Sequence, residues 1–179
     1  MAIQVVFETH AISEDNEQRI ATGWHHGRLS AQGREGARAI GQRRATDGID
    51  AVFSSDLRRA AETAALAFEG TTFPILHDWR LRECDYGEWN SHAAETVHGD
   101  RRPYMDQPYP GGESWRQALA RVARFLDDLP MRWAGCRVVV IGHVATRWGF
   151  EHSLLGVPLE ELVDAPFTWQ EGWEYEVPD

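Results

Sequence analysis

The 179-residue chain has no lysine, only two cysteines and no long apolar run. All 18 basic residues are arginines, against 28 acidic residues, and the formal net charge is −10. This charge repels the phosphate backbone of nucleic acids, so nucleic-acid binding is not expected. The exclusive use of arginine is interpreted as a codon bias, although arginine is also the better residue for two-pronged contacts with phosphate.

The scarcity of cysteine and of apolar runs excludes further classes of protein. Cys84 and Cys136 are far apart and in no spacing typical of a metal site, so we expect both to be reduced and simply packed. No segment reaches the roughly 18 apolar residues of a membrane helix, and the N-terminus resembles no signal peptide. We therefore expect a cytoplasmic protein with no membrane partner, folded as one domain over residues 1–179.

Apolar strand-like runs alternate with helical periods along the chain, which is typical of an α/β fold with a mostly parallel sheet. Strands are predicted over 3–7, 50–54, 73–76 and 137–143, and the last of these is the clearest buried strand. Pro74 restricts the third strand to an edge or an end of the sheet, because proline cannot donate a hydrogen bond to a neighbouring strand.

The first predicted helix lies between the first two strands. Ser30 is the expected N-cap, and Ala37, Ile40 and Ala45 are expected to point inward. The helix is predicted to end near Gly48, a suitable C-cap residue.

Two more helices follow. One is predicted over 57–68, with Asp56 or Ser55 as its N-cap. The other is indicated by apolar residues at helical spacing: Trp115, Leu119, Val122, Leu126 and Leu129.

Reactive side chains follow three of the predicted strands. His10 comes after the first, Arg58 and Arg59 come after the second, and His143 ends the last. Because open parallel sheets bind ligands at the carboxyl ends of their strands, these residues predict one anion-binding pocket. Helical phase does not choose between the arginines, since Arg58 flanks the predicted buried face and Arg59 points away from it.

The order of these motifs resembles that of the histidine phosphatase superfamily, also called the phosphoglycerate mutase-like family, over nearly the whole chain. The stretch THAISEDN is similar to the family's Arg-His-Gly-Glu-Thr motif with its following asparagine, and it keeps His10 and the phosphate ligand Asn16. Further similar segments follow in the family's order: ATGWHHGRLSAQGREGA, SSDLRRAAETA, LRECDYGEW, PGGES and RVVVIGH. The resemblance implies a three-layer α/β/α fold.

The resemblance also implies a set of roles in phosphoryl transfer. His10 would attack phosphorus and carry the phosphoryl group until water removes it. Arg59 and His143 would bind the equatorial oxygens, and Glu83, holding a proton at the working pH, would protonate the leaving group. The implied substrate is a small phosphorylated anion, with no cofactor and no metal.

The chain departs from the family pattern beside the expected nucleophile. Thr9 stands where the family has an arginine that contacts the phosphoryl group, and threonine supplies only one neutral donor. Because a charge-assisted hydrogen bond contributes about 1.5 to 3 kcal/mol, its loss weakens phosphate binding roughly 10- to 100-fold. Ala11 and Val144 replace glycines and add carbon near the phosphate. Three arginines are candidates to replace the missing one: Arg28, Arg58 and Arg147.

A wider group of residues is predicted to line the substrate pocket: Thr22, Gly23, Trp24, Arg28, Arg58, Trp89 and Arg147. Residues 86–113 are expected to form a loop or a cap insertion over the site, since their second half is dense in proline, glycine and aspartate.

Three functions stay open at this point. The first is hydrolysis of a small phosphomonoester. The second is acid–base chemistry by His10, Glu83 and His143 on a substrate without a phosphoryl group, and the third is anion binding without catalysis. The patterns also leave a homodimer open.

Overall fold

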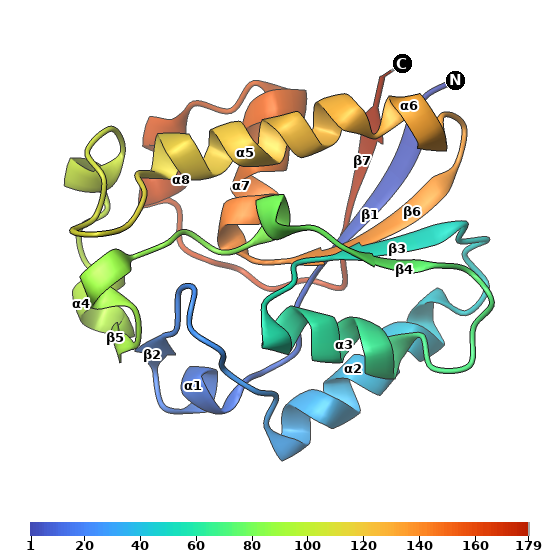
Figure 1. Ribbon diagram of the computed structural model, residues 1–179, viewed down its shortest axis with the longest axis horizontal. Helices are drawn as coiled ribbons and strands as arrows, with labels where there is room; N and C mark the ends of the chain where they lie inside the picture. Colours follow the sequence, from blue (N-terminus) through green and yellow to red (C-terminus); the bar gives the residue numbers. More distant parts are fainter. Residues whose placement is uncertain (179) are drawn as a thin grey trace.

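A computed structural model describes residues 1–178, and a five-stranded sheet forms its centre (Figure 1). Across the sheet the strands are β4 (Ile75–His77), β3 (Ala51–Ser54), β6 (Arg137–Gly142), β1 (Ile3–Thr9) and β7 (Trp173–Val177). The first four are mutually parallel, and β7 pairs antiparallel with β1. The predicted α/β fold with a mostly parallel sheet is therefore confirmed.

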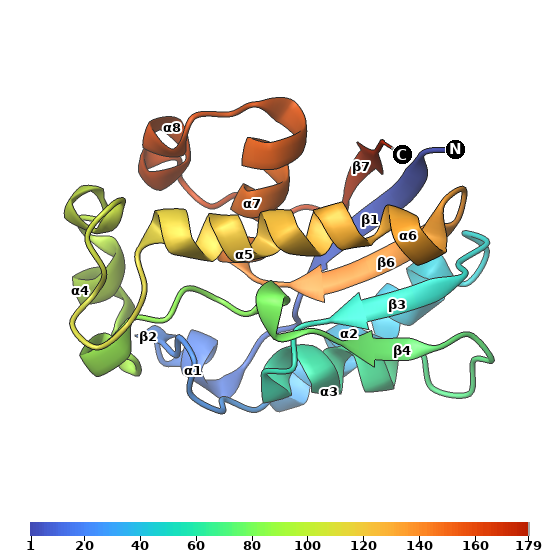
Figure 2. The ribbon, with the colours of Figure 1, turned by 45° about the horizontal axis from the view of Figure 1, so that its top comes forward.

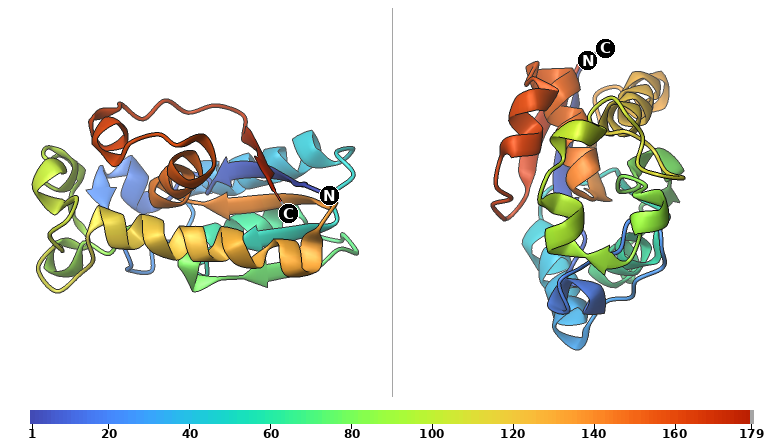
Figure 3. Two further views of the ribbon diagram at one scale, coloured as in Figure 1. Left: turned by 90° about the horizontal axis from the view of Figure 1, so that it is seen from above. Right: turned by 90° about the vertical axis from the view of Figure 1, so that its left-hand side faces the viewer.

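Helices cover both faces of this sheet, as Figures 2 and 3 show. One layer holds α2 (Ala31–Arg44) and α3 (Arg58–Ala67), and the other holds α5 (Trp115–Asp128) and α7 (Val144–Leu155). Shorter helices flank the second layer: α6 (Pro130–Trp133) and α8 (Leu159–Asp164). The arrangement is the predicted three-layer α/β/α fold.

The central strands are apolar on both faces because each face carries its own core. Val5 and Val140 pack into the cluster that includes Phe125 of α5. Val6 and Val139, one position along each strand, pack into the cluster that includes residues of α3. Since burying a valine side chain contributes about 1.5 kcal/mol or more, both cores stabilise these strands.

The register of β1 against β6 places two histidines side by side. Thr9 pairs with Gly142, and the His10 N–H donates to the Gly142 carbonyl at 3.0 Å. His10 and His143 therefore leave the sheet at the same edge.

The helix over 115–128 matches its prediction closely. Ser114 caps it, and the side chain of Gln117 bonds back to the Ser114 N–H, which completes a capping box. The predicted apolar residues are all buried: Trp115, Leu119, Val122, Leu126 and Leu129.

The predicted end of α2 is wrong, although its start is right. Ser30 is the N-cap and accepts a hydrogen bond from the Gly33 N–H. The helix ends at Arg44, so Ala45 is an exposed C-cap rather than an inward residue, and Gly48 lies beyond the turn that follows, with φ +66°. Alanine carries too weak an apolar signal to locate a helix end.

The predicted N-cap of α3 is also wrong. Leu57 occupies that position without a side-chain cap, while the Ser55 hydroxyl accepts from the Leu57 N–H. The Asp56 carboxylate instead pairs with Arg82 at 2.6 Å. The strand predicted over 73–76 is observed as β4 at the sheet edge, just after Pro74.

Residues 86–113 lie beyond the carboxyl ends of the strands, at the left of Figure 1. They contain β5 (His92–Ala93), α4 (Ala94–His98) and two 3-10 turns, η2 (Gly87–Trp89) and η3 (Arg102–Tyr104). β5 pairs with β2 (Ile20–Ala21). Tyr86 and Tyr109 share an apolar cluster with α5 and α7 residues, so this segment is packed against the second helical layer.

Two other short elements lie near the strand ends: α1 (Glu14–Glu17) and the 3-10 turn η1 (Trp79–Leu81). Both cysteines are unpaired, with Cys84 buried. Within residues 1–178, none of the helices has the length and apolar character needed to cross a membrane.

Candidate active site

His10, Arg59 and His143 meet at the carboxyl edge of the sheet. The ring centroids of the two histidines are 5.0 Å apart. Arg59 lies in the first turn of α3, just after β3, and its Nη2 is 3.4 Å from Nδ1 of His143. Three strand exits thus converge at one place, where Arg59 also interacts electrostatically with Glu83.

His10 is held in one tautomer. Its Nδ1 is 2.7 Å from the Ala11 carbonyl oxygen, and since a carbonyl only accepts, Nδ1 carries the hydrogen. Nε2 therefore keeps its lone pair. Burial, with Arg59 nearby, lowers the pKa of His10 to about 3, so the ring is neutral near pH 7. A neutral imidazole with a free Nε2 is the form that a histidine nucleophile requires.

The guanidinium of Arg59 is fixed by main-chain oxygens. It donates to the Gly23 carbonyl at 2.8 Å and to the His25 carbonyl at 3.2 Å, and a third N–H faces His143. Two of its five N–H groups have no acceptor within the described chain, so they are available to a ligand. Burial lowers the pKa of Arg59, but a guanidinium stays charged at physiological pH.

The prediction from helical phase that Arg59 points away from the buried face is wrong. Arg59 is only 2% exposed, whereas the Arg58 side chain is 59% exposed. The guanidinium of Arg59 bonds to the carbonyl groups of Gly23 and His25 in a distant loop, and an apolar pattern in α3 cannot reveal such partners.

His143 provides a buried donor that lacks a partner. Because the Arg59 N–H faces its Nδ1, the hydrogen of the neutral ring lies on Nε2. Burial, with Arg59 and His10, holds the pKa of His143 well below its usual value. Nε2 is buried and makes no hydrogen bond in residues 1–178. A buried donor without an acceptor is costly, and an anion bound beside His10 would relieve that cost.

Glu83 lies at the N-terminus of α7. Its Oε1 accepts from the Cys84 N–H at 2.9 Å and from the Ala145 N–H at 3.1 Å. Oε2 has no hydrogen-bond partner among the described residues. One carboxyl oxygen is thus fixed by main-chain donors, while the other is available to a ligand.

Thr9 and Asn16 each keep a free polar group. The hydroxyl of Thr9, half-buried at the end of β1, makes no hydrogen bond inside the described range. Oδ1 of Asn16 accepts from the backbone and hydroxyl of Ser13 at 3.0 and 2.9 Å, as part of the α1 capping box. Its amide nitrogen has no such partner.

The three arginines considered as replacements for the missing one are held by acids. The exposed Arg28 bonds to Glu14 at 2.7 Å, and Arg58 lies 3.9 Å from Glu62. Arg147 is buried but pairs with Glu151 at 3.2 Å and stacks over Trp173. None of them bonds to His10, Arg59 or His143 in the described structure.

Gly23 and Trp24 do contact the site. The Gly23 carbonyl binds Arg59, and its φ is +56°. A Cβ on Gly23 would lie 1.8 Å from Oδ1 of Asn90, so only glycine fits there. Nε1 of Trp24 donates to the Glu83 carbonyl at 2.7 Å, which ties this loop to the predicted acid.

Thr22 and Trp89 serve the surrounding structure. Buried Thr22 donates its hydroxyl to Asp15 at 2.8 Å. Trp89 packs edge-on against Tyr104, with ring centroids 5.4 Å apart, inside the 86–113 segment. Neither side chain bonds to Arg59 or to the two histidines.

Two supporting features were not predicted from the sequence. The Thr63 hydroxyl accepts from the Ala11 N–H at 3.0 Å and donates to the Arg59 carbonyl at 2.7 Å, which joins the His10 loop to α3. Arg121 lies buried on the apolar face of α5. The sequence does signal this residue, because it places an arginine on the apolar face of a helix, and a buried arginine needs partners.

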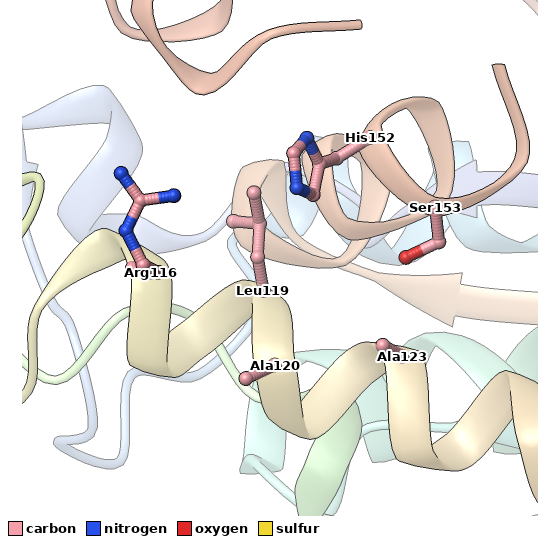
Figure 4. A pocket seen from close by; sticks show the side chains of 6 residues that line it. All are labelled: Arg116, Leu119, Ala120, Ala123, His152 and Ser153. Atoms are coloured by element: carbon pink, nitrogen blue, oxygen red, sulfur yellow. The ribbon is translucent and has the colours of Figure 1, made fainter. Parts of the chain in front are cut away.

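A groove of about 410 Å³ between α5 and α7 carries none of the predicted site residues (Figure 4). Two of its polar side chains are engaged, since Arg116 bonds to Asp106 and Nδ1 of His152 is 2.8 Å from the Val157 carbonyl. Among residues 1–178, no group of three or more histidine, cysteine or acidic side chains is arranged to hold a metal ion.

This chain is similar to known proteins both in sequence and in fold. The profile of the histidine phosphatase superfamily (branch 1) matches residues 6–169. A 2,3-bisphosphoglycerate-dependent phosphoglycerate mutase of Methylobacterium sp. (strain 4-46) is 37% identical over 78% of this chain and 74% of its own. Phosphoserine phosphatase 1 of Hydrogenobacter thermophilus is 28% identical over 89% and 80%. The solved structure of Bacillus stearothermophilus YhfR superposes with a TM-score of 0.82 at 24% identity, covering 94% and 88%.

Proposed function

The chain belongs to the histidine phosphatase superfamily, and from this we propose that it hydrolyses a small phosphomonoester through a phosphohistidine on His10. One observation carries the proposal: a neutral His10 with a free Nε2 lies beside unpaired donors of Arg59 and His143. In the proposed reaction, these donors bind the equatorial oxygens of the phosphoryl group that Nε2 attacks.

In the first step, Nε2 of His10 forms a bond to phosphorus as the bond from phosphorus to the ester oxygen breaks. The electron pair of that bond goes to the leaving oxygen, which takes a proton from Oε2 of Glu83. Two N–H groups of Arg59 and the Nε2–H of His143 bind the phosphoryl oxygens, where charge develops.

In the second step, water attacks the phosphohistidine and gives a proton to the Glu83 carboxylate. The bond from phosphorus to Nε2 breaks, inorganic phosphate leaves, and His10 returns to its neutral form. The Ala11 carbonyl stabilises the positive charge on the ring while the phosphoryl group is attached, because it accepts from Nδ1–H throughout.

The identity to a phosphoglycerate mutase supports a second candidate. In that reaction a hydroxyl group of a phosphorylated acceptor, rather than water, would take the phosphoryl group from His10. Released phosphate indicates the phosphatase, whereas an isomerised phosphoester without released phosphate indicates the mutase.

The proposal is tested with a panel of phosphomonoesters that includes phosphoserine, a phosphoglycerate and p-nitrophenyl phosphate. We expect phosphate release and an acid-labile phosphohistidine in the wild type, and neither in His10→Ala. His152→Ala is a matched control on the exposed end of α7 and should retain both. If no substrate of the panel gives turnover or a phosphoenzyme, the proposal fails. Binding of an anion without turnover would then indicate a non-catalytic domain. Turnover of a substrate that lacks phosphate would indicate acid–base chemistry.

A further inference from the structure

Arg121 of α5 has no part in the steps above, yet it is 1% exposed and uses all five of its N–H groups. Nη1 donates to the Arg80 and Arg82 carbonyls at 2.7 and 2.8 Å. Nη2 donates to the Glu83 carbonyl at 2.8 Å and to Glu113 at 2.5 Å, and Nε faces both Glu113 oxygens at 3.2 Å. Most of these partners belong to the segment that carries the predicted acid.

This segment, residues 80–83, is held by side chains instead of a sheet or a long helix. The Leu81 carbonyl accepts from the Thr146 hydroxyl of α7 at 2.8 Å, and Nε1 of Trp24 is a second donor to the Glu83 carbonyl. When the Arg121 bonds are included, each main-chain carbonyl from residue 80 to residue 83 accepts a hydrogen bond from a side chain. The main-chain position of Glu83 depends on these donors, and Arg121 supplies three of the bonds.

Glu113 keeps Arg121 in place and connects it to the far side of the acid. Both of its carboxyl oxygens face Nε of Arg121, and Oε1 also accepts from the Asp85 N–H at 3.1 Å. The Glu113 N–H in turn donates to the Asp85 carbonyl at 3.0 Å. The pair thus binds the chain before and after Glu83, and its opposite charges make the burial of a guanidinium tolerable.

We propose that the Arg121–Glu113 pair is a positioning device for Glu83, which sets Oε2 at the leaving oxygen. The proposal rests on the proposed function, in which Glu83 is the acid. Oε1 is already anchored to the Ala145 N–H, so the orientation of the carboxyl group depends on where the 80–83 segment lies relative to α7. A misplacement of about 1 Å can cost on the order of 100-fold in rate, so loosening this segment impairs proton transfer before it impairs phosphate binding.

The choice of leaving group separates this role from a purely structural one. An alkyl phosphate needs a proton on its leaving oxygen, whereas p-nitrophenolate leaves without one. Arg121→Lys keeps the charge but loses the fork that serves three carbonyls. We expect kcat for an alkyl phosphate to fall roughly 10- to 100-fold, while kcat for p-nitrophenyl phosphate and KM for both substrates change little.

A double-mutant cycle tests whether the effect acts through Glu83. In a Glu83→Gln background the acid is absent, so Arg121→Lys should cause no further loss with the alkyl phosphate. Arg124→Lys is the matched control, because its side chain lies exposed on the same helix, and it should leave both substrates unaffected. Unfolding curves establish that each variant is folded.

Glu113→Gln is the second variant in case Arg121→Lys does not fold, since it retains size while removing the charge that orients Arg121. The same split between substrates is expected, with a smaller loss. An equal loss with both substrates, or an additive loss in the Glu83→Gln background, would overturn the positioning role. If the wild type releases phosphate from neither substrate, the proposed function fails instead, which is a separate outcome.

Discussion

Lowering the pH from 7 to 4 should leave His10 uncharged, although an ordinary histidine would take up a proton. The reason is burial of the ring, with the Arg59 guanidinium nearby as a second cause. The hydrogen bond to the Ala11 carbonyl acts in the opposite direction but is the smallest of the three effects. The balance of burial and charge at the centre of the site thus keeps the ring neutral.

The lowering of the His10 pKa from 6.5 to about 3 corresponds to about 5 kcal/mol of extra cost for charging the ring in the folded protein. At pH 5 about 99% of His10 would be neutral, compared with about 3% for a histidine of ordinary pKa. The nucleophile should thus remain uncharged in mild acid.

The direct assay is NMR titration of the Cε1–H resonance of His10, assigned by comparison with His10→Gln. We expect its chemical shift to stay constant from pH 8 to about pH 4. The same protein unfolded in denaturant supplies the reference, in which all histidines titrate near 6.5. A midpoint near 6.5 for His10 in the folded protein would refute the reasoning, because it would mean that burial and Arg59 do not govern the ring.

Substitutions at Thr9, Thr63 and His10 should change the kinetics or the stability of the protein in measurable ways. Thr9→Arg should raise kcat/KM for p-nitrophenyl phosphate about 10- to 100-fold, because a charge-assisted hydrogen bond to the phosphoryl group contributes about 1.5 to 3 kcal/mol. Unchanged steady-state kinetics would count against a phosphate site beside residue 9. Thr63→Val should lower the free energy of unfolding by about 1 to 3 kcal/mol in urea, since it leaves the buried Ala11 N–H without its acceptor, and Thr63→Ser should restore most of it. The folded pKa of His10 is about 3 and its unfolded value is near 6.5, so between these pH values His10 binds fewer protons in the folded protein than in the unfolded chain. The stability of the protein should therefore fall as the pH drops through that window. His10→Gln should flatten this fall, and an unchanged slope in pH-dependent denaturation would contradict the prediction.

The strands and the strand-end residues were predictable because their signals are local. Four predicted strands are present, with small shifts at their ends. The signal is clearest for β1 and β6, since valine-rich runs buried on both faces have few alternatives to a central strand. β7 was not predicted, because its alternating pattern lies at the sheet edge, next to an irregular segment. Antiparallel pairing with β1 decides its place, and that partner is far away in the sequence.

The arginines show where local patterns stop being informative. Helical phase placed Arg59 away from the buried face, and only the resemblance to the family selected it, yet carbonyl groups 34 and 36 positions away bury its guanidinium. Arg147 lies one turn after His143, but its acid partner and an aromatic ring draw it away from the site. An arginine side chain is long, so its location depends on which distant acceptor it reaches.

By itself, the sequence of this protein determined a mostly parallel sheet with histidines at the ends of two strands, because strand signals and strand exits are read within a few residues. Tertiary structure alone decided the tautomers of those histidines, the lowered pKa of His10 and the support of Glu83 by Arg121. These properties arise from burial and from hydrogen bonds between segments that only the folded chain brings together.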